Sequence, residues 1–211
     1  MTDTDPRTHW DEIYRTKRST SSGQPSKLLV QISEGLTPGR SLDLGSSNGD
    51  DVVWLATQGW QALGVDISVV ACDRATARAA SLDLQNRARF EARDLGQGVP
   101  DGPFDLITAL YFQSHVDLPR AQVLREAAGQ VAPGGHLLIV SHAAPPPWAS
   151  AEMLAKADPF PTVDEELEVI ADAPEDWIIL RAEKVSRQGK GPDGASAELW
   201  DNLIWLERCA A

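Results

Sequence analysis

The chain of 211 residues carries 19 lysines and arginines against 31 acids, a formal net charge of −12 at pH 7. This field repels phosphate backbones and anionic membranes, so both nucleic acid and membranes are disfavoured as partners. No stretch approaches the roughly 20 apolar residues of a membrane helix. Met1–Arg7 lacks the basic start and apolar core of a secretory signal, so we expect a cytoplasmic protein.

The first 142 residues alternate helix-like and strand-like segments. Residues 1–35 are expected to form an N-terminal helical cap, and residues 36–142 a core. The expected strands of the core are Ser41–Leu44, Ala62–Val65 with Asp66 at its end, Arg89–Ala92, Phe104–Leu110 and His136–Val140. The expected helices are Asp51–Thr57, Val69–Leu84 with Ser68 as a possible cap, and Leu118–Val131. Short apolar strands between helices favour a parallel sheet covered on both faces.

The last part of the core and the remaining chain show different patterns. Pro133–Gly135 predicts a tight turn before the fifth strand. Residues 143–211 begin with a proline-rich loop, in which Pro145–Phe160 is open to two interpretations, an apolar lid or a surface loop. Thr162–Ala171 predicts a helix capped by Thr162.

Two alternating segments close the chain. Trp177–Ser186 and Glu198–Arg208 flank a glycine-rich turn at Gly189–Gly194 and predict a hairpin. The expected fold is a single α/β domain over residues 1–211. It is a Rossmann-like, seven-stranded and mostly parallel sheet, with an antiparallel C-terminal hairpin and helices on both faces.

A glycine-containing loop, Asp43–Gly49, follows the first expected strand and opens a helix. Glycine at the end of a strand permits a sharp turn and the close approach of a ligand. Asp66, after the second strand, is suited to accept hydrogen bonds from ribose hydroxyls. Asp94, after the third strand, is suited to accept one from an adenine amine. The apolar side chains of Ile67 and Leu95 are suited to enclose the ring.

The glycine-containing loop, followed by an acid after the second strand and another after the third, resembles the pattern of the class I S-adenosylmethionine-dependent methyltransferases. The loop matches their Asp/Glu-x-Gly-x-Gly-x-Gly pattern at Asp43, Gly45 and Gly49, with Ser47 at the middle glycine. Pro133–Gly135 resembles their Pro-Gly-Gly turn. The resemblance implies S-adenosyl-L-methionine as cofactor, a ribose-binding role for Asp66 and an adenine-binding role for Asp94. The implied cofactor-binding residues of the core are Asp43, Gly45, Ser46, Ser47, Asn48, Gly49, Asp66, Ile67, Asp94, Leu95 and Leu110.

The N-terminal segment carries a closer resemblance. Its sequence Trp10-Asp11-Glu12-Ile13-Tyr14 is similar to the start of small bacterial proteins of the tellurite-resistance and thiol-methyltransferase-like branch. In that branch this segment folds over the methionine end of the cofactor. Trp10 and Tyr14 share one helix face, where an aromatic ring attracts a sulfonium by roughly 0.5–2 kcal/mol. Packing of both rings on the core is the equally open alternative.

Methyl transfer mainly requires alignment and exclusion of water, and it needs a base only when the acceptor must lose a proton. The segment Leu110–His115 follows the fourth strand and would lie beside the methyl group. Tyr111 and His115 are the candidate catalytic residues, with His115 as the base or else a solvent-facing loop histidine. His142 is the second candidate base, whereas His9 and His136 are expected to be structural or exposed.

No metal site is expected, because no spaced pair of ligands lies on one element, and Cys72 and Cys209 are isolated. An NAD-dependent oxidoreductase is disfavoured, because Gly45 and Gly49 do not match the Gly-x-Gly-x-x-Gly spacing. A non-catalytic S-adenosylmethionine-binding or protein-interaction module stays open as an alternative.

Residues Leu110–Gln113 lack the Asn/Asp-Pro-Pro-aromatic motif of enzymes that methylate base amines. With the acidic charge, this favours a small-molecule acceptor: a thiol, a hydroxyl, a metalloid oxyanion or a carboxylate. A monomer or homodimer is expected.

Overall fold

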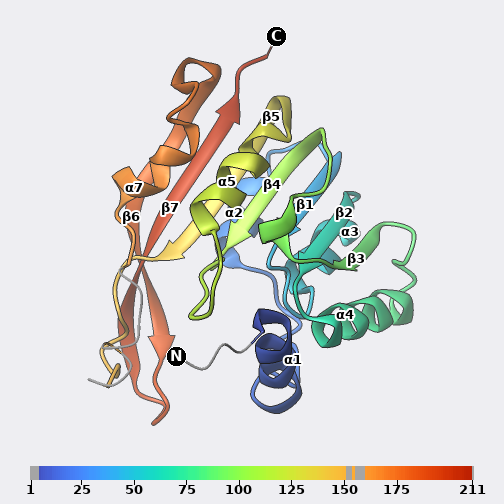
Figure 1. Cartoon of the computed structure of the whole chain (residues 1–211), viewed down its shortest axis with the longest axis vertical. Coiled ribbons are helices and arrows are strands. Elements are labelled where there is room, and N and C mark those ends of the chain that lie inside the picture. Colours follow the sequence, from blue (N-terminus) through green and yellow to red (C-terminus); the bar gives the residue numbers. More distant parts are fainter. Residues whose placement is uncertain (1–4, 151–153, 155–159, 211) are drawn as a thin grey trace.

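The computed structural model describes residues 5–150, 154 and 160–210. Its seven strands form one sheet in the order β3-β2-β1-β4-β5-β7-β6 (Figure 1). The strands are β1 (Arg40–Leu44), β2 (Gln61–Asp66), β3 (Ala88–Ala92), β4 (Phe104–Leu110), β5 (Val131–His142), β6 (Trp177–Lys190) and β7 (Ser196–Arg208). The first five strands run parallel, and β7 pairs antiparallel with both β5 and β6. The predicted fold class, mostly parallel with an antiparallel hairpin, is therefore confirmed.

Three of the described α-helices begin at residues whose side chains accept hydrogen bonds from free backbone N–H groups. Asp5 accepts from the N–H of Thr8, Ser68 from that of Ala71, and Thr162 from that of Glu165. The caps predicted at Ser68 and Thr162 are both present. The helices are α1 (Pro6–Thr16), α2 (Lys27–Ser33), α3 (Asp50–Thr57), α4 (Val69–Ser81), α5 (Arg120–Gly129) and α7 (Val163–Leu167), with 3-10 turns η1 (Leu95–Gln97), η2 (Glu168–Ile170) and η3 (Pro174–Asp176).

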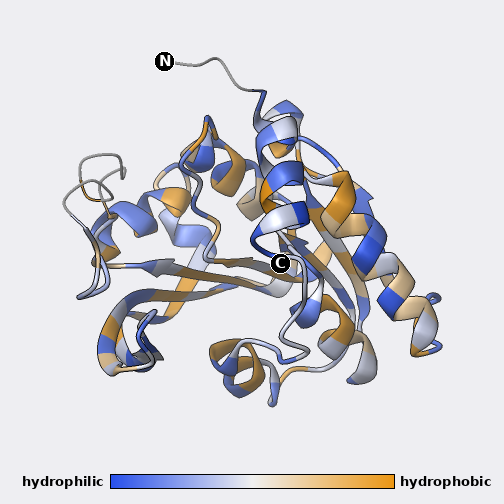
Figure 2. Ribbon diagram, turned by 90° about the horizontal axis from the view of Figure 1, so that it is seen from below, coloured by the Kyte–Doolittle hydropathy of each residue, from blue (hydrophilic) through white to orange (hydrophobic). Residues whose placement is uncertain are grey.

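Two hydrophobic clusters lie on opposite faces of the sheet. One cluster packs Val123 and Leu124 of α5 against the strands, together with Val169 of η2. The other packs Leu29 of α2 and Leu55 of α3 against the opposite face. Figure 2 shows hydrophobic and hydrophilic residues mixed along the flanking helices, as expected for helices that cover a sheet with one side only.

The predicted tight turn at Pro133–Gly135 is wrong, because these residues lie inside β5. Phe104 pairs with Val131 and Leu106 with His136, so the residues between Val131 and His136 form a bulge in the parallel ladder. Gly134 has φ +73°, a backbone conformation that favours glycine. The residues Pro133–Gly135 do interrupt regular structure, but the interruption is a bulge within a strand and not a turn before it.

Two predicted helices of the core are shorter than expected, and the helix expected over Thr162–Ala171 spans only Val163–Leu167 before the 3-10 turn η2. The helix expected over Leu118–Val131 spans only Arg120–Gly129, because Val131 already pairs with β4. The helix expected over Val69–Leu84 ends at Ser81, and Asp83 then takes a left-handed conformation with φ +58°. Both differences lie at helix ends, where local sequence signals are weakest.

The carboxyl ends of β1 to β5 share one edge of the sheet, and α1 packs beside this edge against α4 (Figure 1). Asp11 of α1 accepts a hydrogen bond of 2.6 Å from Ser68 Oγ, next to the start of α4. Arg74 Nη1 of α4 donates to the carbonyl oxygen of Tyr14 at 2.7 Å. These contacts fix the N-terminal helix where the loops after the strands meet.

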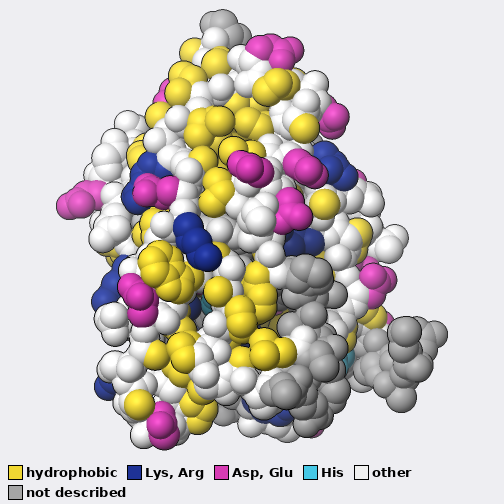
Figure 3. All heavy atoms as spheres, turned by 90° about the vertical axis from the view of Figure 1, so that its left-hand side faces the viewer, with side chains coloured by type: hydrophobic (Ala, Val, Ile, Leu, Met, Phe, Trp, Pro, Cys, Tyr) yellow, Lys and Arg dark blue, Asp and Glu magenta, His cyan; other side chains and the backbone are white. Residues whose placement is uncertain are grey.

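Part of the predicted lid over Pro145–Phe160, including Met153, lies outside the described residues. At the β6 edge of the sheet, Ile178 and Ile179 are about half exposed, at 47% and 51%. Figure 3 looks onto this side and shows hydrophobic side chains at the surface with acidic ones among them. Among the described residues, no helix has the length and apolar character needed to cross a membrane.

Candidate active site

A cavity of about 1070 Å³ opens at the carboxyl edge of the sheet. The loops after β1 to β4 form one part of the cavity wall, and side chains of α1 and α2 form another part. The predicted site residues in its lining are Trp10, Tyr14, Gly45, Ser47, Asp66, Ile67, Asp94, Leu95, Leu110, Tyr111 and His115. Residues far apart in the sequence thus meet in one cavity, as expected at the carboxyl edge of an α/β sheet.

The loop after β1 is held in a conformation that requires glycine. Gly45 has φ +71°, and a Cβ added there would lie 2.7 Å from Cδ2 of Phe112. Gly49 caps α3 with φ +78°, and its Cβ would lie 2.5 Å from the Phe90 ring. Ser47 also adopts a positive φ, +52°, so the serine at the family's middle glycine position keeps a glycine-like backbone.

Four predicted residues of this loop lie outside the lining of the large cavity: Asp43, Ser46, Asn48 and Gly49. Asp43 is buried beneath the loop and accepts a hydrogen bond of 2.6 Å from Thr108 Oγ1. Burial, reinforced by the nearby charges of Asp51 and Asp66, raises the pKa of Asp43 well above its usual range. Asp43 therefore links β1 to β4 and lies outside the cavity lining.

Ser46 and Asn48 face a second hollow, which Ser47 also borders. Ser46 Oγ and Asn48 Oδ1 are buried and have no hydrogen-bond partner among the described residues. Such unpaired polar atoms are unusual in a folded protein and are consistent with a polar ligand near the loop.

Asp66 occupies the end of β2 and faces the loop. Its Oδ2 accepts from the Ser47 N–H at 2.9 Å and from Tyr14 Oη at 3.3 Å, and its Oδ1 accepts from the Ser68 N–H at 2.9 Å. Burial raises the pKa of Asp66 above its usual value, although all three hydrogen bonds favour the ionised form. The carboxylate is thus rigidly held, and it lines the cavity with acceptor capacity left for a ligand hydroxyl.

The neighbouring part of the cavity combines one acid with apolar walls. Asp94 Oδ1 accepts from the Gly96 N–H at 2.9 Å and caps η1, which presents Leu95 to the cavity beside Ile67. The two carboxylates of Asp66 and Asp94 fit the ribose and the adenine amine of S-adenosylmethionine. The glycine-bounded backbone permits the close approach of the cofactor, and the apolar walls fit the adenine ring. The residues present therefore fit the cofactor that the sequence implies.

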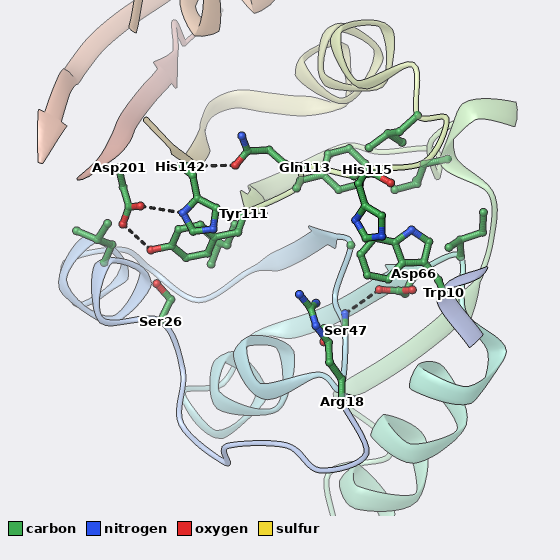
Figure 4. A pocket seen from close by; sticks show the side chains of 18 of the residues that line it. Trp10, Arg18, Ser26, Ser47, Asp66, Tyr111, Gln113, His115, His142 and Asp201 are labelled. Atoms are coloured by element: carbon green, nitrogen blue, oxygen red, sulfur yellow. Dashed lines mark hydrogen bonds and ion pairs between the residues drawn. The ribbon is translucent and has the colours of Figure 1, made fainter. Parts of the chain in front are cut away.

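The α1 side of the cavity is aromatic. The rings of Trp10 and Tyr14 lie 6.1 Å apart, that of His115 lies 5.2 Å from Trp10, and the Arg18 guanidinium lies 5.5 Å from the Trp10 ring. His9, expected to be structural or exposed, has its Nε2 2.7 Å from His115 Nε2. Figure 4 shows Trp10, His115 and Asp66 together on one side of the pocket.

His115 itself is exposed, and burial of part of its ring, followed by the charges of His9 and Arg18, lowers its pKa. The neutral ring is thus favoured at neutral pH. Its assignment as the catalytic base stays a prediction.

A second polar cluster, which contains the predicted catalytic residue Tyr111 and the second candidate base His142, lies on the opposite side of the pocket (Figure 4). Buried Asp201 of β7 accepts hydrogen bonds from Tyr111 Oη at 2.8 Å and Arg187 Nε at 2.6 Å, and its Oδ1 lies 3.1 Å from His142 Nδ1. All four residues line the cavity. The members that the sequence analysis missed are Asp201 and Arg187; the signal that could have indicated Asp201 is an acid in a hairpin strand rich in apolar residues.

The electrostatics of this cluster keep Asp201 ionised. Burial alone would raise its pKa, but the hydrogen bonds from His142, Arg187 and Tyr111 outweigh burial and lower it. Burial and the adjacent Asp201 raise the pKa of the Tyr111 phenol well above its usual value. Tyr111, the second predicted catalytic residue, is therefore a hydrogen-bond donor here, and its backbone takes the uncommon φ of +55°.

Fold, loop and ordered acids together define a Rossmann-like S-adenosylmethionine-dependent methyltransferase of class I. The profile of a family described as "Methyltransferase domain" matches residues 14–168, and the chain belongs to this family. The predicted class is thereby confirmed. The non-catalytic alternative is not favoured.

Individual relatives share parts of the chain or its fold. The 27-O-demethylrifamycin SV methyltransferase of Amycolatopsis mediterranei is 31% identical over 137 residues, which cover 62% of this chain and 48% of that protein. The chain thus spans about half the length of this curated relative.

Two solved structures show the same fold. Magnesium protoporphyrin IX methyltransferase from Synechocystis PCC 6803, with bound S-adenosylhomocysteine, aligns with TM-score 0.70 at 15% identity and covers 97% of this chain and 100% of that one. TehB from Haemophilus influenzae aligns with TM-score 0.69 at 16% identity over 94% of this chain and 66% of that one. At these identities the likeness concerns the fold alone.

Proposed function

We propose that the protein transfers the methyl group of S-adenosylmethionine to a small molecule by in-line displacement. The observation that carries the proposal is the large cavity at the carboxyl edge of the sheet, in which two distinct groups of polar residues lie on opposite sides. Its volume of about 1070 Å³ matches the upper end of the range for ligand pockets, about 300–1,000 Å³. It can therefore enclose a nucleoside cofactor together with a small acceptor.

The residues after β1 to β4 are proposed to hold the cofactor. Asp66 would accept from the ribose hydroxyls, Asp94 from the adenine amine, and Ile67 and Leu95 would contact the two faces of the ring. When bound, the cofactor supplies an activated methyl group on a sulfonium. The aromatic rings of Trp10 and Tyr14 would attract this cation and exclude water from it.

The acceptor is proposed to lie between Leu110, the residues that follow it, and the β5–β7 side of the cavity. An enclosed site of this size suits a thiol, a hydroxyl compound or a metalloid oxyanion better than a polymer. The net charge of −12 also disfavours a nucleic-acid substrate. The 27-O-demethylrifamycin SV methyltransferase is named for a small-molecule acceptor, which supports the same class here.

Product formation tests the proposal. The protein is incubated with S-adenosylmethionine and a panel of thiols, phenols, aliphatic alcohols, carboxylates and tellurite or selenite. Products are then sought by mass spectrometry, with a short RNA duplex as the polymer control. We expect a methylated small molecule and an equal amount of S-adenosylhomocysteine. Methylation of RNA alone would overturn the proposed acceptor class, and no methylation at all would overturn the proposed activity.

A further inference from the structure

The cavity contains a well-defined pair of polar side chains, His142 and Asp201, to which the proposed cofactor contacts assign no role. His142 ends β5, and the antiparallel register places it directly opposite Asp201 of β7. The Oδ1 of Asp201 lies 3.1 Å from Nδ1 of His142. A carboxylate only accepts hydrogen bonds, so Nδ1 is the donor and the lone pair of the neutral ring is on Nε2.

The ring of His142 is fixed from several sides. Its backbone N–H donates to Gln113 Oε1 at 2.8 Å, and its ring lies 4.6 Å from the Tyr111 ring at an interplanar angle of 33°. Its side chain is 44% exposed and lines the cavity, whereas that of Asp201 is only 1% exposed. A buried acid therefore orients a histidine whose other nitrogen is open to a ligand.

The acid is itself firmly held. Arg187 and Tyr111 both donate to Oδ2 of Asp201, which leaves Oδ1 to His142. The Arg187 guanidinium also lies 5.4 Å from the Tyr111 ring. These are the charged and titratable groups that face His142 from β4, β6 and β7, and together they keep Asp201 as an anion next to the ring.

We propose that His142, oriented by Asp201, is the general base for a hydroxyl acceptor, an inference that rests on the proposed function. The acceptor O–H proton moves to Nε2 of His142 while the oxygen forms its bond to the methyl carbon. The carbon–sulfur bond breaks and its electron pair stays on sulfur. The adjacent Asp201 carboxylate stabilises the imidazolium, which then returns its proton to water.

This assignment narrows the acceptor class. A hydroxyl with a pKa near that of tyrosine, about 10, is protonated at neutral pH and needs a base. A carboxylate, an aryl thiol or an ionised oxyanion already carries its attacking electron pair. The oriented base therefore favours acceptors whose hydroxyl group is protonated at neutral pH, such as phenols and alcohols, and it is dispensable for acceptors that are already ionised.

His115 lacks the same arrangement. Its Nε2 faces Nε2 of His9 at 2.7 Å, and no acid contacts its ring within the described part of the chain. A nucleophile-activating histidine is normally oriented by a third group through its other nitrogen. His142 has such a group, and His115 does not.

The first test measures the tautomer of His142 in the protein alone. The chain has only four histidines, so ring nitrogen signals in a long-range ¹⁵N–¹H spectrum can be assigned with His142→Gln and His136→Gln variants. We expect neutral His142 to carry its hydrogen on Nδ1. In Asp201→Asn the amide can donate, so the hydrogen should move to Nε2, as in the analogous change in serine proteases. A wild-type Nε2–H tautomer, or one that Asp201→Asn leaves unchanged, would overturn the inference.

The second test uses phenol and benzenethiol as probe acceptors with S-adenosylmethionine. His142→Gln should lower the rate with phenol about 100-fold, the typical contribution of a general base, and lower the rate with benzenethiol by a much smaller factor. His136→Gln, at a site outside the cavity, is the matched control. Equal losses with both probes, or a loss with phenol in His115→Gln but not in His142→Gln, would overturn the inference.

The two claims fail differently. If the wild-type protein gives no methylated product, the proposed function fails. The tautomer of His142 then decides alone whether Asp201 orients this histidine as inferred. With methylation of benzenethiol but of no hydroxyl compound, the proposed function stands and the inferred base does not.

Discussion

Tyr14 Oη lies 3.3 Å from Asp66 Oδ2, so the N-terminal helix contacts the acid at the end of β2 directly. Tyr14 is 3% exposed and Asp66 is 6% exposed, and both also line the cavity. The helix α1 therefore forms part of the wall on which the proposed ribose site depends. Order in α1 and cofactor binding should consequently be linked.

Replacing Tyr14 by Phe removes one donor from a buried carboxylate and keeps the ring. We expect the free energy of unfolding to fall by about 1 kcal/mol, the net value of one intramolecular hydrogen bond. Urea denaturation of both proteins measures the difference. A Tyr14→Phe protein as stable as the wild type would show that this contact does not stabilise α1.

Asp66→Ala should weaken the binding of S-adenosylmethionine at least about tenfold, because charge-assisted hydrogen bonds to the ribose are lost. Asp73→Ala is the matched control, since Asp73 is an exposed acid on α4. Calorimetric titration of the folded variants measures both dissociation constants. The ribose assignment fails if the Asp66 variant keeps its affinity or if both variants lose it equally.

Gly45→Ala places a Cβ 2.7 Å from Phe112 Cδ2 at a residue with φ +71°. Such a backbone costs an L-residue about 1–2 kcal/mol before the steric conflict is counted. We expect lower stability and weaker cofactor binding. Gly35→Ala, where an added Cβ meets nothing within 4 Å, should change neither. A Gly45→Ala protein that matches Gly35→Ala in both measurements would contradict the loop geometry.

The raised pKa of Asp51 leads us to expect an unusual pH dependence of the free energy of unfolding. Burial raises its pKa to about 6, against the favourable effect of a hydrogen bond of 2.6 Å from the Ser26 N–H. The folded protein therefore holds this proton more tightly than the unfolded chain, in which the pKa is about 4. The penalty for the ionised form is fully present above pH 6 and is relieved as the pH falls through 6 toward 4.

Comparison with Asp51→Asn cancels the contributions of the titrating groups that do not interact with Asp51. Relative to that variant, the wild-type protein should gain on the order of 2 kcal/mol between pH 7.5 and pH 4.5. Urea denaturation at several pH values gives both curves. Parallel curves, or a wild-type loss on acidification relative to Asp51→Asn, would contradict the raised pKa.

The cofactor side of the site was predictable because its signals are local. Gly45, Asp66 and Asp94 each lie at or within two residues of the carboxyl end of a strand, and parallel strands bring these ends to one edge. The same reasoning placed Tyr111 and His115 in the cavity. Sequence reasoning could not predict the buried position of Asp43 or the contact between His9 and His115, because both depend on how side chains pack.

The pair His142–Asp201 shows the limit of local reasoning. Its members lie 59 residues apart, and their contact depends on the register between β5 and β7. A shift of one residue would turn Asp201 to the other face of the sheet. Pro133–Gly135 shows a second limit, since glycine marks both turns and bulges, and only pairing with β4 distinguishes them.

Calorimetric titration of the purified protein with S-adenosylmethionine, S-adenosylhomocysteine and NAD tests the central claim most directly. The account predicts micromolar binding of the first two ligands and no binding of NAD, with weaker binding in Asp66→Ala. Absence of binding to both S-adenosyl compounds by the folded protein would contradict it, and so would binding of NAD alone.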